Sequence, residues 1–309
     1  MLRFGKLPKR IDKRTIQLKS ILKTEELPEL PESYDIDSAL GGIDDDRMFN
    51  NDTLGCCVIA AQAHDIFRKE KSEIGAQPEI TDEAVKAEYL NQTGGLDTGL
   101  VMLDSLKKWR KGWQINGMLH KIYAFAEVDR LDHNDVKYCI YLLNGCEFGM
   151  MVYQTDMNQF KAGEIWDLTD NDGMFRGGHG VYTYRYNVAD KQVIKKKQGK
   201  QLVSKVLGYT KDGLWCMTWA KRQFMTWDFW DKRIDEAYGI VDDKDSADSA
   251  LDVDKLQHYL DLIAEGGNPN EESSCWVAKL YVGFGNGIAK HILHCDTRLP
   301  APVRLRKHK

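Results

Sequence analysis

The spacing of apolar residues changes near the middle of this chain. From about residue 50 to 145 apolar residues recur every three or four positions, as between Ile59 and Phe67, which is the spacing of one helical face. From about residue 146 to 240 they alternate instead, as in HGVYTYRYNV, which is typical of strands. Helices followed by strands predict an α+β fold, with a helical lobe at about 50–145, a β-rich lobe at about 146–240 and a cleft between them.

The same patterns predict individual elements within the two lobes. A helix is expected to begin near Cys57, a second to follow Thr81 as its N-cap, and a third to run from a Thr98 cap to Gly112. LDHNDVKYCIYLLNG is expected to be helical up to Gly145, and EFGMMVYQ to form a strand. The lysine-rich DKQVIKKKQGKQ is typical of a hairpin tip, and the aromatic WDFWDK is expected to lie in the wall of the β lobe with its Trp side chains at alternate positions.

Two segments flank a domain of residues 32–240. Residues 1–31 form a basic arm punctuated by prolines, and because each proline favours extended backbone, we expect an extended segment that lies over another surface. Residues 241–309 are expected to form a C-terminal extension with an acidic stretch, a helix in DKLQHYLDLIAEGG, strand-like residues and a basic tail. The two basic termini suggest contacts with other protein subunits of an assembly.

The overall charge and composition exclude several classes of partner. The formal net charge is -4 and the sequence pI is about 6.1, so no overall positive field attracts nucleic acid or an anionic membrane. No apolar run approaches the roughly 18 residues of a membrane-spanning helix, and the basic start lacks the apolar core of a secretory signal. The seven cysteines are an odd number without a repeated short spacing, which favours reduced thiols over a disulfide framework. We therefore expect a cytoplasmic protein with no nucleic-acid partner and no membrane partner.

One string of residues resembles a metal site. His291, His294 and Cys295 lie close together in the sequence. On a helix the two histidines share a face, whereas on a strand they point to opposite faces, and no second pair of ligands stands at a recognisable spacing. The sequence therefore predicts no metal site and no cofactor.

Cys57 follows Gly55 and Cys56 directly before a helical pattern. A helix N-terminus offers free backbone N–H groups and a positive potential, which stabilise a thiolate, and Gly55 allows a substrate backbone to approach. A nucleophilic thiol also needs an imidazole, and His179 in RGGHGVYTYRY is the best candidate because it enters a strand behind two glycines. The alternatives are a small cysteine packed in the core and a disulfide between the two adjacent cysteines.

Five segments occur in the order found in papain-like cysteine peptidases. They are LPESYDID, the Gly-Cys-Cys helix start, NGCEFGMMV, GGHGVYTYRYN and LWCMTWAKRQFMTWDFWDKRIDEAYGIV. Over roughly residues 30–240 the chain resembles this family, and most of all its compact members from bacteria and bacteriophages. The resemblance implies a papain-like two-lobed fold, with Cys57 as the nucleophile, His179 as its partner and a peptide or protein as the substrate.

Two positions depart from the family pattern. The glutamine that donates to the oxyanion is replaced by the shorter amide of Asn51, six residues before the cysteine. The asparagine that orients the histidine is replaced by Met217, two residues before a shielding Trp219. Strand alternation places Met217 and Trp219 on one face. Because methionine accepts no strong hydrogen bond, Thr218, a backbone carbonyl or another group has to orient the histidine.

Three hypotheses remain open from the sequence. The first is a peptidase with a Cys57–His179 dyad, in which Asn51 and the Cys57 backbone N–H form the oxyanion hole. The second is a catalytically silent papain-fold protein with a structural or binding role, for example in a bacteriophage particle. The arm favours it, because it is shorter than the helical inhibitory pro-segment of secreted papain-like zymogens. The third is another thiol acyl transfer at the same dyad. A cleft filled by the arm or by large side chains such as Met217 favours the second hypothesis.

Overall fold

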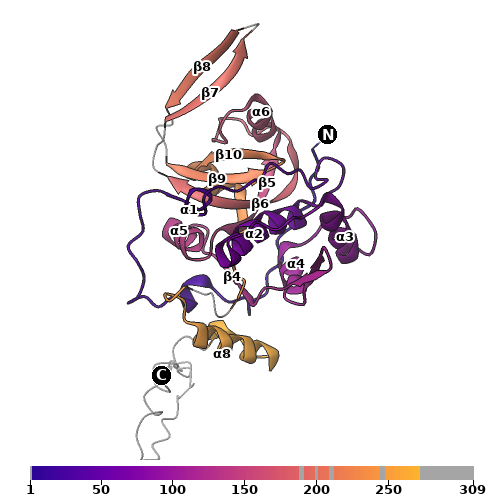
Figure 1. Ribbon diagram of the computed structural model, residues 1–309, viewed down its shortest axis with the longest axis vertical. Coiled ribbons are helices and arrows are strands. Elements are labelled where there is room, and N and C mark those ends of the chain that lie inside the picture. The colour runs from indigo at the N-terminus through magenta and orange to yellow at the C-terminus, as the bar shows by residue number, and fades with distance from the viewer. Residues whose placement is uncertain (1, 188–190, 199–200, 209–211, 244–247, 272–309) are drawn as a thin grey trace, which may run out of the picture.

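The computed structural model describes residues 2–187, 191–198, 201–208, 212–243 and 248–271 (Figure 1). It confirms the expected α+β fold, because helices gather in the N-terminal part of the chain and an antiparallel sheet follows. The α-helices of the described residues are α1 (Ile36–Ala39), α2 (Cys57–Ile74), α3 (Asp82–Thr93), α4 (Met102–Trp109), α5 (His133–Leu142), α6 (Gln154–Ala162), α7 (Trp227–Arg233) and α8 (Val253–Ala264).

The central sheet joins the two parts of the chain. Its strands lie in the order β10-β9-β6-β5-β11-β4, with β1 also paired to β6, and all neighbours are antiparallel. The strands are β1 (Tyr34–Asp35), β4 (Ala124–Glu127), β5 (Cys146–Tyr153), β6 (Phe175–Asn187), β9 (Gly213–Thr218), β10 (Lys221–Thr226) and β11 (Ile234–Val241). Since β4 lies within the predicted helical lobe and pairs with β11, this lobe is not purely helical.

Two hairpins lie outside the central sheet. One pairs β2 (Trp113–Ile115) with β3 (Met118–His120). The other pairs β7 (Lys191–Gln198) with β8 (Gln201–Gly208), as expected for the lysine-rich segment, and it projects from the rest of the molecule in Figure 1.

Local sequence signals located some helix ends and missed others. Thr81 caps α3 as predicted, since its hydroxyl accepts a hydrogen bond from the Ala84 N–H at 3.1 Å. The predicted Thr98 cap of α4 is wrong, because that helix begins at Met102 and Gly99 lies before it with a φ of 78°, which is not helical.

The placement of WDFWDK in a strand of the wall is also wrong. These residues form α7, and the hydroxyl of Thr226 caps it by accepting from the Phe229 N–H at 3.2 Å. The threonine sits at the end of β10 and turns the chain into a helix instead of a further strand. The tryptophans therefore follow helical spacing instead of alternating.

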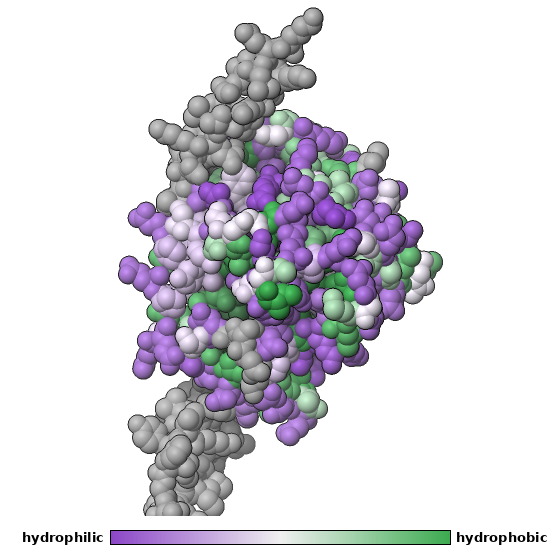
Figure 2. Space-filling view, in the orientation of Figure 1, coloured by the Kyte–Doolittle hydropathy of each residue, from purple (hydrophilic) through white to green (hydrophobic). Residues whose placement is uncertain are grey.

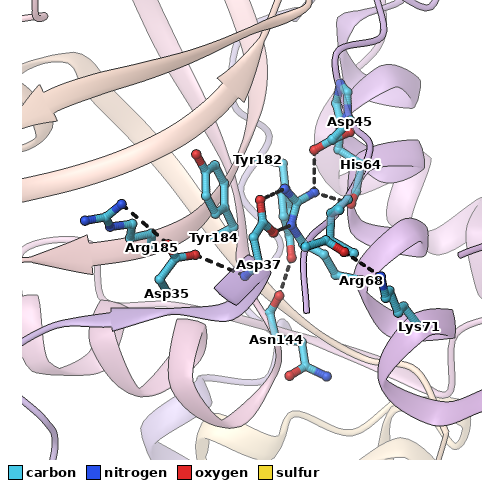
Figure 3. Close-up of polar contacts among 12 residues, drawn as sticks. Asp35, Asp37, Asp45, His64, Arg68, Lys71, Asn144, Tyr182, Tyr184 and Arg185 are labelled. Carbon is cyan, nitrogen blue, oxygen red and sulfur yellow. Dashed lines mark hydrogen bonds and ion pairs between the residues drawn. The ribbon is translucent and has the colours of Figure 1, made fainter. Parts of the chain in front are cut away.

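A buried polar cluster holds α2 in place (Figure 3). The guanidinium of Arg68 on α2 bonds both oxygens of Asp37 at 2.8 and 3.1 Å and forms an ion pair with Asp45 at 2.6 Å. Its carbon Cζ also lies over the rings of Tyr182 and Tyr184 on β6, 4.9 and 4.6 Å from their centroids. The cluster thus joins α2, the segment before it and β6, which are the elements that carry the candidate site.

The N-terminal arm is extended apart from a short 3₁₀ helix, η1 (Leu18–Ile21), and it lies on its own domain. Several of its basic side chains pair with carboxylates of the domain, as in Lys9 with Glu127 at 2.6 Å and Lys19 with Asp129 at 3.2 Å. Over the described residues the arm thus makes contacts within its own chain, and its expected contact with other subunits stays a prediction.

The remaining predictions for the C-terminus fall partly outside the described residues. The helix expected after the acidic stretch is α8, followed by the 3₁₀ turn η2 (Pro269–Glu271). The string His291, His294 and Cys295 and the basic tail lie outside the described residues. Within the part that is described, no group of three or more His, Cys, Asp or Glu side chains is arranged to hold a metal ion.

The visible surface is mixed in polarity. Figure 2 shows hydrophobic residues on this face as separate patches among hydrophilic ones. None of the helices in the described part of the chain is long and apolar enough to cross a membrane.

Candidate active site

Cys57 is the first residue of α2 and its thiol is buried beneath the surface, with 1% of the residue exposed. The backbone N–H of Gly180 donates to its Sγ at 3.3 Å. A Cβ at Gly180 would lie 3.1 Å from the Cα of Val58, so this glycine allows β6 to approach the start of α2 closely. Burial raises the pKa of the Cys57 thiol, against the opposing effect of the N–H groups of Gly180 and Gly5.

Cys56 points to a different environment from its neighbour. Its thiol donates to the backbone carbonyl of Phe49 at 3.1 Å, and burial raises its pKa. Both cysteines are free thiols, so the alternative of a disulfide between them is not formed. Both cysteines are buried in one hydrophobic cluster, and they differ in the groups that contact their thiols.

His179 lies on β6 and its ring is held on two sides. Its Nε2 lies 2.7 Å from the hydroxyl oxygen of Thr218, and the indole of Trp219 stacks on the ring with centroids 3.9 Å apart and planes at 13°. The other ring nitrogen, Nδ1, has no hydrogen-bond partner among the described residues. Burial lowers the pKa of His179 to about 3, so the imidazole is neutral at physiological pH.

Thr218, and not Met217, forms the hydrogen bond with the histidine, at the point where the strand ends. β9 stops at Thr218, and Trp219 and Ala220 form the turn to β10 with φ values of 44° and 57°. The alternation that places Met217 and Trp219 on one face therefore does not extend to Trp219. Met217 packs instead in a hydrophobic cluster with side chains of β6, β9 and β10.

Asn51 lies beside the cysteine in a loop before α2. Its side-chain N–H donates to the carbonyl of Leu54 at 3.1 Å, which holds the amide in place and leaves its second N–H for another acceptor. One small cavity, of about 10 Å³, is lined by all six residues singled out in the sequence. These residues are Asn51, Cys57, His179, Met217, Thr218 and Trp219.

The N-terminal arm fills the cleft beside Cys57. The N–H of Lys6 donates to the carbonyl of Gly178 at 3.1 Å, and the carbonyl of Gly5 accepts from the N–H of Leu100 at 2.7 Å. The arm thus runs between β6 and the segment before α4. A Cβ at Gly5 would lie 1.7 Å from the carbonyl oxygen of Gly55, so only glycine fits this close passage. From the sequence, a cleft filled by the arm is one of two outcomes that favour the silent protein, and the one local signal for this close passage is the glycine between Phe4 and Lys6.

The comparisons find similarity in the fold and not in the sequence. No protein-family model and no curated protein matches the chain. Xylellain, a cysteine protease from Xylella fastidiosa, matches 77% of this chain and 95% of its own, with a TM-score of 0.50 and 16% identity. The proform of the Amb a 11 cysteine protease, a ragweed pollen allergen, matches 71% of this chain and 67% of its own, with a TM-score of 0.50 and 10% identity.

The chain has the papain-like fold. Within this papain-like fold, the arm covers the thiol but leaves an open pocket of about 400 Å³ on the side of Phe4. The ring of Phe4 meets the edges of Trp219 and His179, at centroid distances of 5.8 and 6.3 Å. The arm therefore closes the cleft at the thiol and leaves a pocket open beside it.

Proposed function

We propose that this protein is a thiol hydrolase of peptide or amide bonds, with Cys57 as nucleophile and His179 as general base and acid. The observation that carries the proposal is the 2.7 Å contact between the Thr218 hydroxyl and His179 Nε2. It supplies the orienting group that the substitution at Met217 removes, and it leaves Nδ1 as the nitrogen that can take a proton from the thiol.

The reaction proceeds in two steps once the arm has left the cleft. Nδ1 of His179 takes the proton of the Cys57 thiol, and the thiolate attacks the carbonyl carbon of the substrate. His179 then returns the proton to the leaving amine, and a thioester remains on the cysteine. Water, activated by the same imidazole, attacks the thioester and releases the acid. The Cys57 backbone N–H and the Asn51 amide stabilise the developing oxyanion.

The closed form described here holds this pair in its neutral state. Burial raises the pKa of Cys57 and lowers the pKa of His179, so a thiolate and an imidazolium are both disfavoured. Departure of the arm admits water to both groups and removes the cause of both shifts. The arm therefore acts as an inhibitory segment as well as a cover.

A second candidate is the catalytically silent binding or structural protein. The observation that favours it is the filled cleft, since Cys57 is 1% exposed and the arm is bonded to both walls. The third hypothesis, acyl transfer to an amine, uses the same dyad and differs only in the acceptor of the thioester.

A full-length Gly5→Ala variant tests these candidates, because its new methyl group cannot fit beside Gly55. Iodoacetamide labelling from pH 5 to 9, located by mass spectrometry, is combined with hydrolysis of a fluorogenic peptide mixture. In the Gly5→Ala variant we expect rapid labelling of Cys57 and hydrolysis of the peptides. A second substitution, His179→Ala, should abolish the rapid labelling, and Cys57→Ala should abolish the hydrolysis. Labelling at the rate of an ordinary thiol, with no hydrolysis, would support the silent protein. Release of the peptide only when an amine is supplied would support acyl transfer.

A further inference from the structure

The side chain of Lys6 occupies a closed pocket of the domain. Lysine is almost never fully buried unless paired. Here 2% of the Lys6 side chain is exposed, and its Nζ lies 2.7 Å from Oδ2 of Asp235 and 2.8 Å from Oε1 of Glu236. The Glu236 side chain is fully buried, and its second oxygen accepts from the hydroxyl of Tyr238 at 2.9 Å. The ammonium group of Lys6 thus forms ion pairs with two carboxylates, those of Asp235 and Glu236.

The domain builds this pocket without help from the arm. Asp235 and Glu236 lie at the start of β11, where the pairing with β5 is irregular between Ile234 and Glu236. On β5 a Cβ at Gly149 would lie 2.0 Å from Cε of Lys6, so the absence of a side chain there makes room for the lysine stem. We call this space, bounded by Gly149, Asp235 and Glu236, the Lys6 pocket. Its residues lie more than a hundred positions from the arm in the sequence.

The carboxylates of the Lys6 pocket need a cation. A buried carboxylate without a partner is costly, and burial raises the pKa of Glu236 while the charge of Lys6 lowers it. When the arm leaves the cleft, the ammonium group leaves with it. The vacated pocket is then an acidic site, with the Glu236 side chain buried and the Asp235 side chain 25% exposed, that favours another cation of similar length.

The side chain that fills the Lys6 pocket leaves the arm beside the candidate nucleophile. The backbone of Lys6 is bonded to Gly178, which directly precedes His179, and the charge of Lys6 lowers the pKa of Cys57. A main chain that lies along Gly178 next to the thiol therefore carries one of its side chains to the mouth of this pocket. In the closed form that side chain is Lys6.

We propose that the Lys6 pocket is a specificity site that takes a lysine or arginine side chain of a peptide lying in the cleft. The proposal rests on the proposed function, because it assigns the substrate class of the same cleft. Lys6 of the arm is then a resident competitor for this class of substrate. Carboxylates at 2.7 and 2.8 Å from the ammonium group discriminate a cation from an apolar side chain of the same length.

Peptide binding tests this proposal without depending on catalysis. The protein is the full chain with Gly5→Ala and Lys6→Ala, which opens the cleft and empties the pocket. Two fluorescein-labelled peptides carry the arm sequence LRFGKLPK, one with its lysine and one with norleucine in place of Lys6, and their affinities are measured by fluorescence anisotropy. We expect the lysine peptide to bind at least about tenfold more tightly, because norleucine keeps the four-carbon stem and lacks the ammonium group.

Variants of the pocket identify the site of this preference. Adding Glu236→Gln should reduce the ratio of affinities to about threefold or less, whereas Glu164→Gln, an exposed glutamate elsewhere, should leave it unchanged. Equal affinities, no binding of either peptide, or a preference that survives Glu236→Gln would overturn the proposal. Hydrolysis is measured separately on a matched pair of fluorogenic peptides. A lysine preference in binding without hydrolysis would reject the proposed function and retain a site for basic peptides. Hydrolysis without a lysine preference would support the proposed function and reject the Lys6 pocket as a specificity site.

Discussion

The hydroxyl of Thr218 lies 2.7 Å from Nε2 of His179, at the end of β9 and directly before the tryptophan that stacks on the ring. Hydrogen bonding at Nε2 and stacking on the ring face together determine where Nδ1 points. The threonine thus holds the imidazole through Nε2 and leaves Nδ1 without a hydrogen-bond partner among the described residues, and His179 and Cys57 line the same small cavity.

Removal of this hydroxyl should impair chemistry more than binding. In the Gly5→Ala background, Thr218→Val keeps the shape of the side chain and removes the hydrogen bond, so we expect kcat to fall about tenfold or more with little change in KM. Met217→Leu is the matched control, because that side chain packs in a hydrophobic cluster, and it should change kcat less than about twofold. A Thr218→Val enzyme with unchanged kcat would show that another group orients His179.

Displacement of the arm should expose the thiol. The wild-type chain should react slowly with iodoacetamide, and Gly5→Ala should react at least about tenfold faster at Cys57, because its Cβ would lie 1.7 Å from the carbonyl oxygen of Gly55. Ile11→Ala alters the same arm at a side chain that is 80% exposed and should leave the rate unchanged. Equal labelling rates in all three proteins, read by mass spectrometry, would mean that the arm does not control access.

The buried histidine should make stability depend on pH. In the folded chain the pKa of His179 is about 3, below its ordinary value of 6.5, so protons bind the unfolded state more strongly in this interval. The stability due to neutral His179 is fully present above pH 6.5 and is lost as pH falls toward 3. Between pH 6.5 and pH 3, the unfolding free energy of the wild-type chain should fall by about 1.4 kcal/mol per pH unit relative to that of His179→Gln. Urea unfolding at several pH values measures this difference, and a difference that stays constant with pH would contradict it.

Removal of Arg68 should destabilise the fold far more than removal of a surface lysine on the same helix. Arg68→Met removes the guanidinium that pairs with both Asp37 and Asp45. Asp37 keeps its ion pair with Arg222, but the fully buried Asp45 keeps only His64, and we expect a cost of about 3–5 kcal/mol. Lys71→Met loses only a bond to a backbone carbonyl at the surface, and should cost less than about 1 kcal/mol. Both values follow from urea denaturation curves at pH 7. Similar losses for the two variants would mean that the cluster in Figure 3 is not what anchors α2.

Local signals in the sequence predicted the elements that depend on near neighbours. The apolar spacing after Cys57 predicted α2, and Thr81 marked the start of α3, because both depend on residues within a few positions of each other. The predicted conformation of WDFWDK and the predicted start of α4 were wrong, because a cap or a turn in the structure overrides the local sequence signal there. Thr226 converted WDFWDK from an expected strand into α7, and the loop through Gly99 shortened α4.

The sequence by itself determined that a mainly helical part precedes a strand-rich part, that a thiol stands at a helix N-terminus and that His179 is the histidine proposed as its partner. Only the tertiary structure decided which residue orients that histidine, because the left-handed turn at Trp219 ends the alternation that β9 would otherwise continue. It also decided that the arm closes the cleft, since Lys6 and Asp235 are 229 residues apart in the sequence. Contacts over such separations depend on how the sheet and α2 pack together, and no local periodicity encodes them.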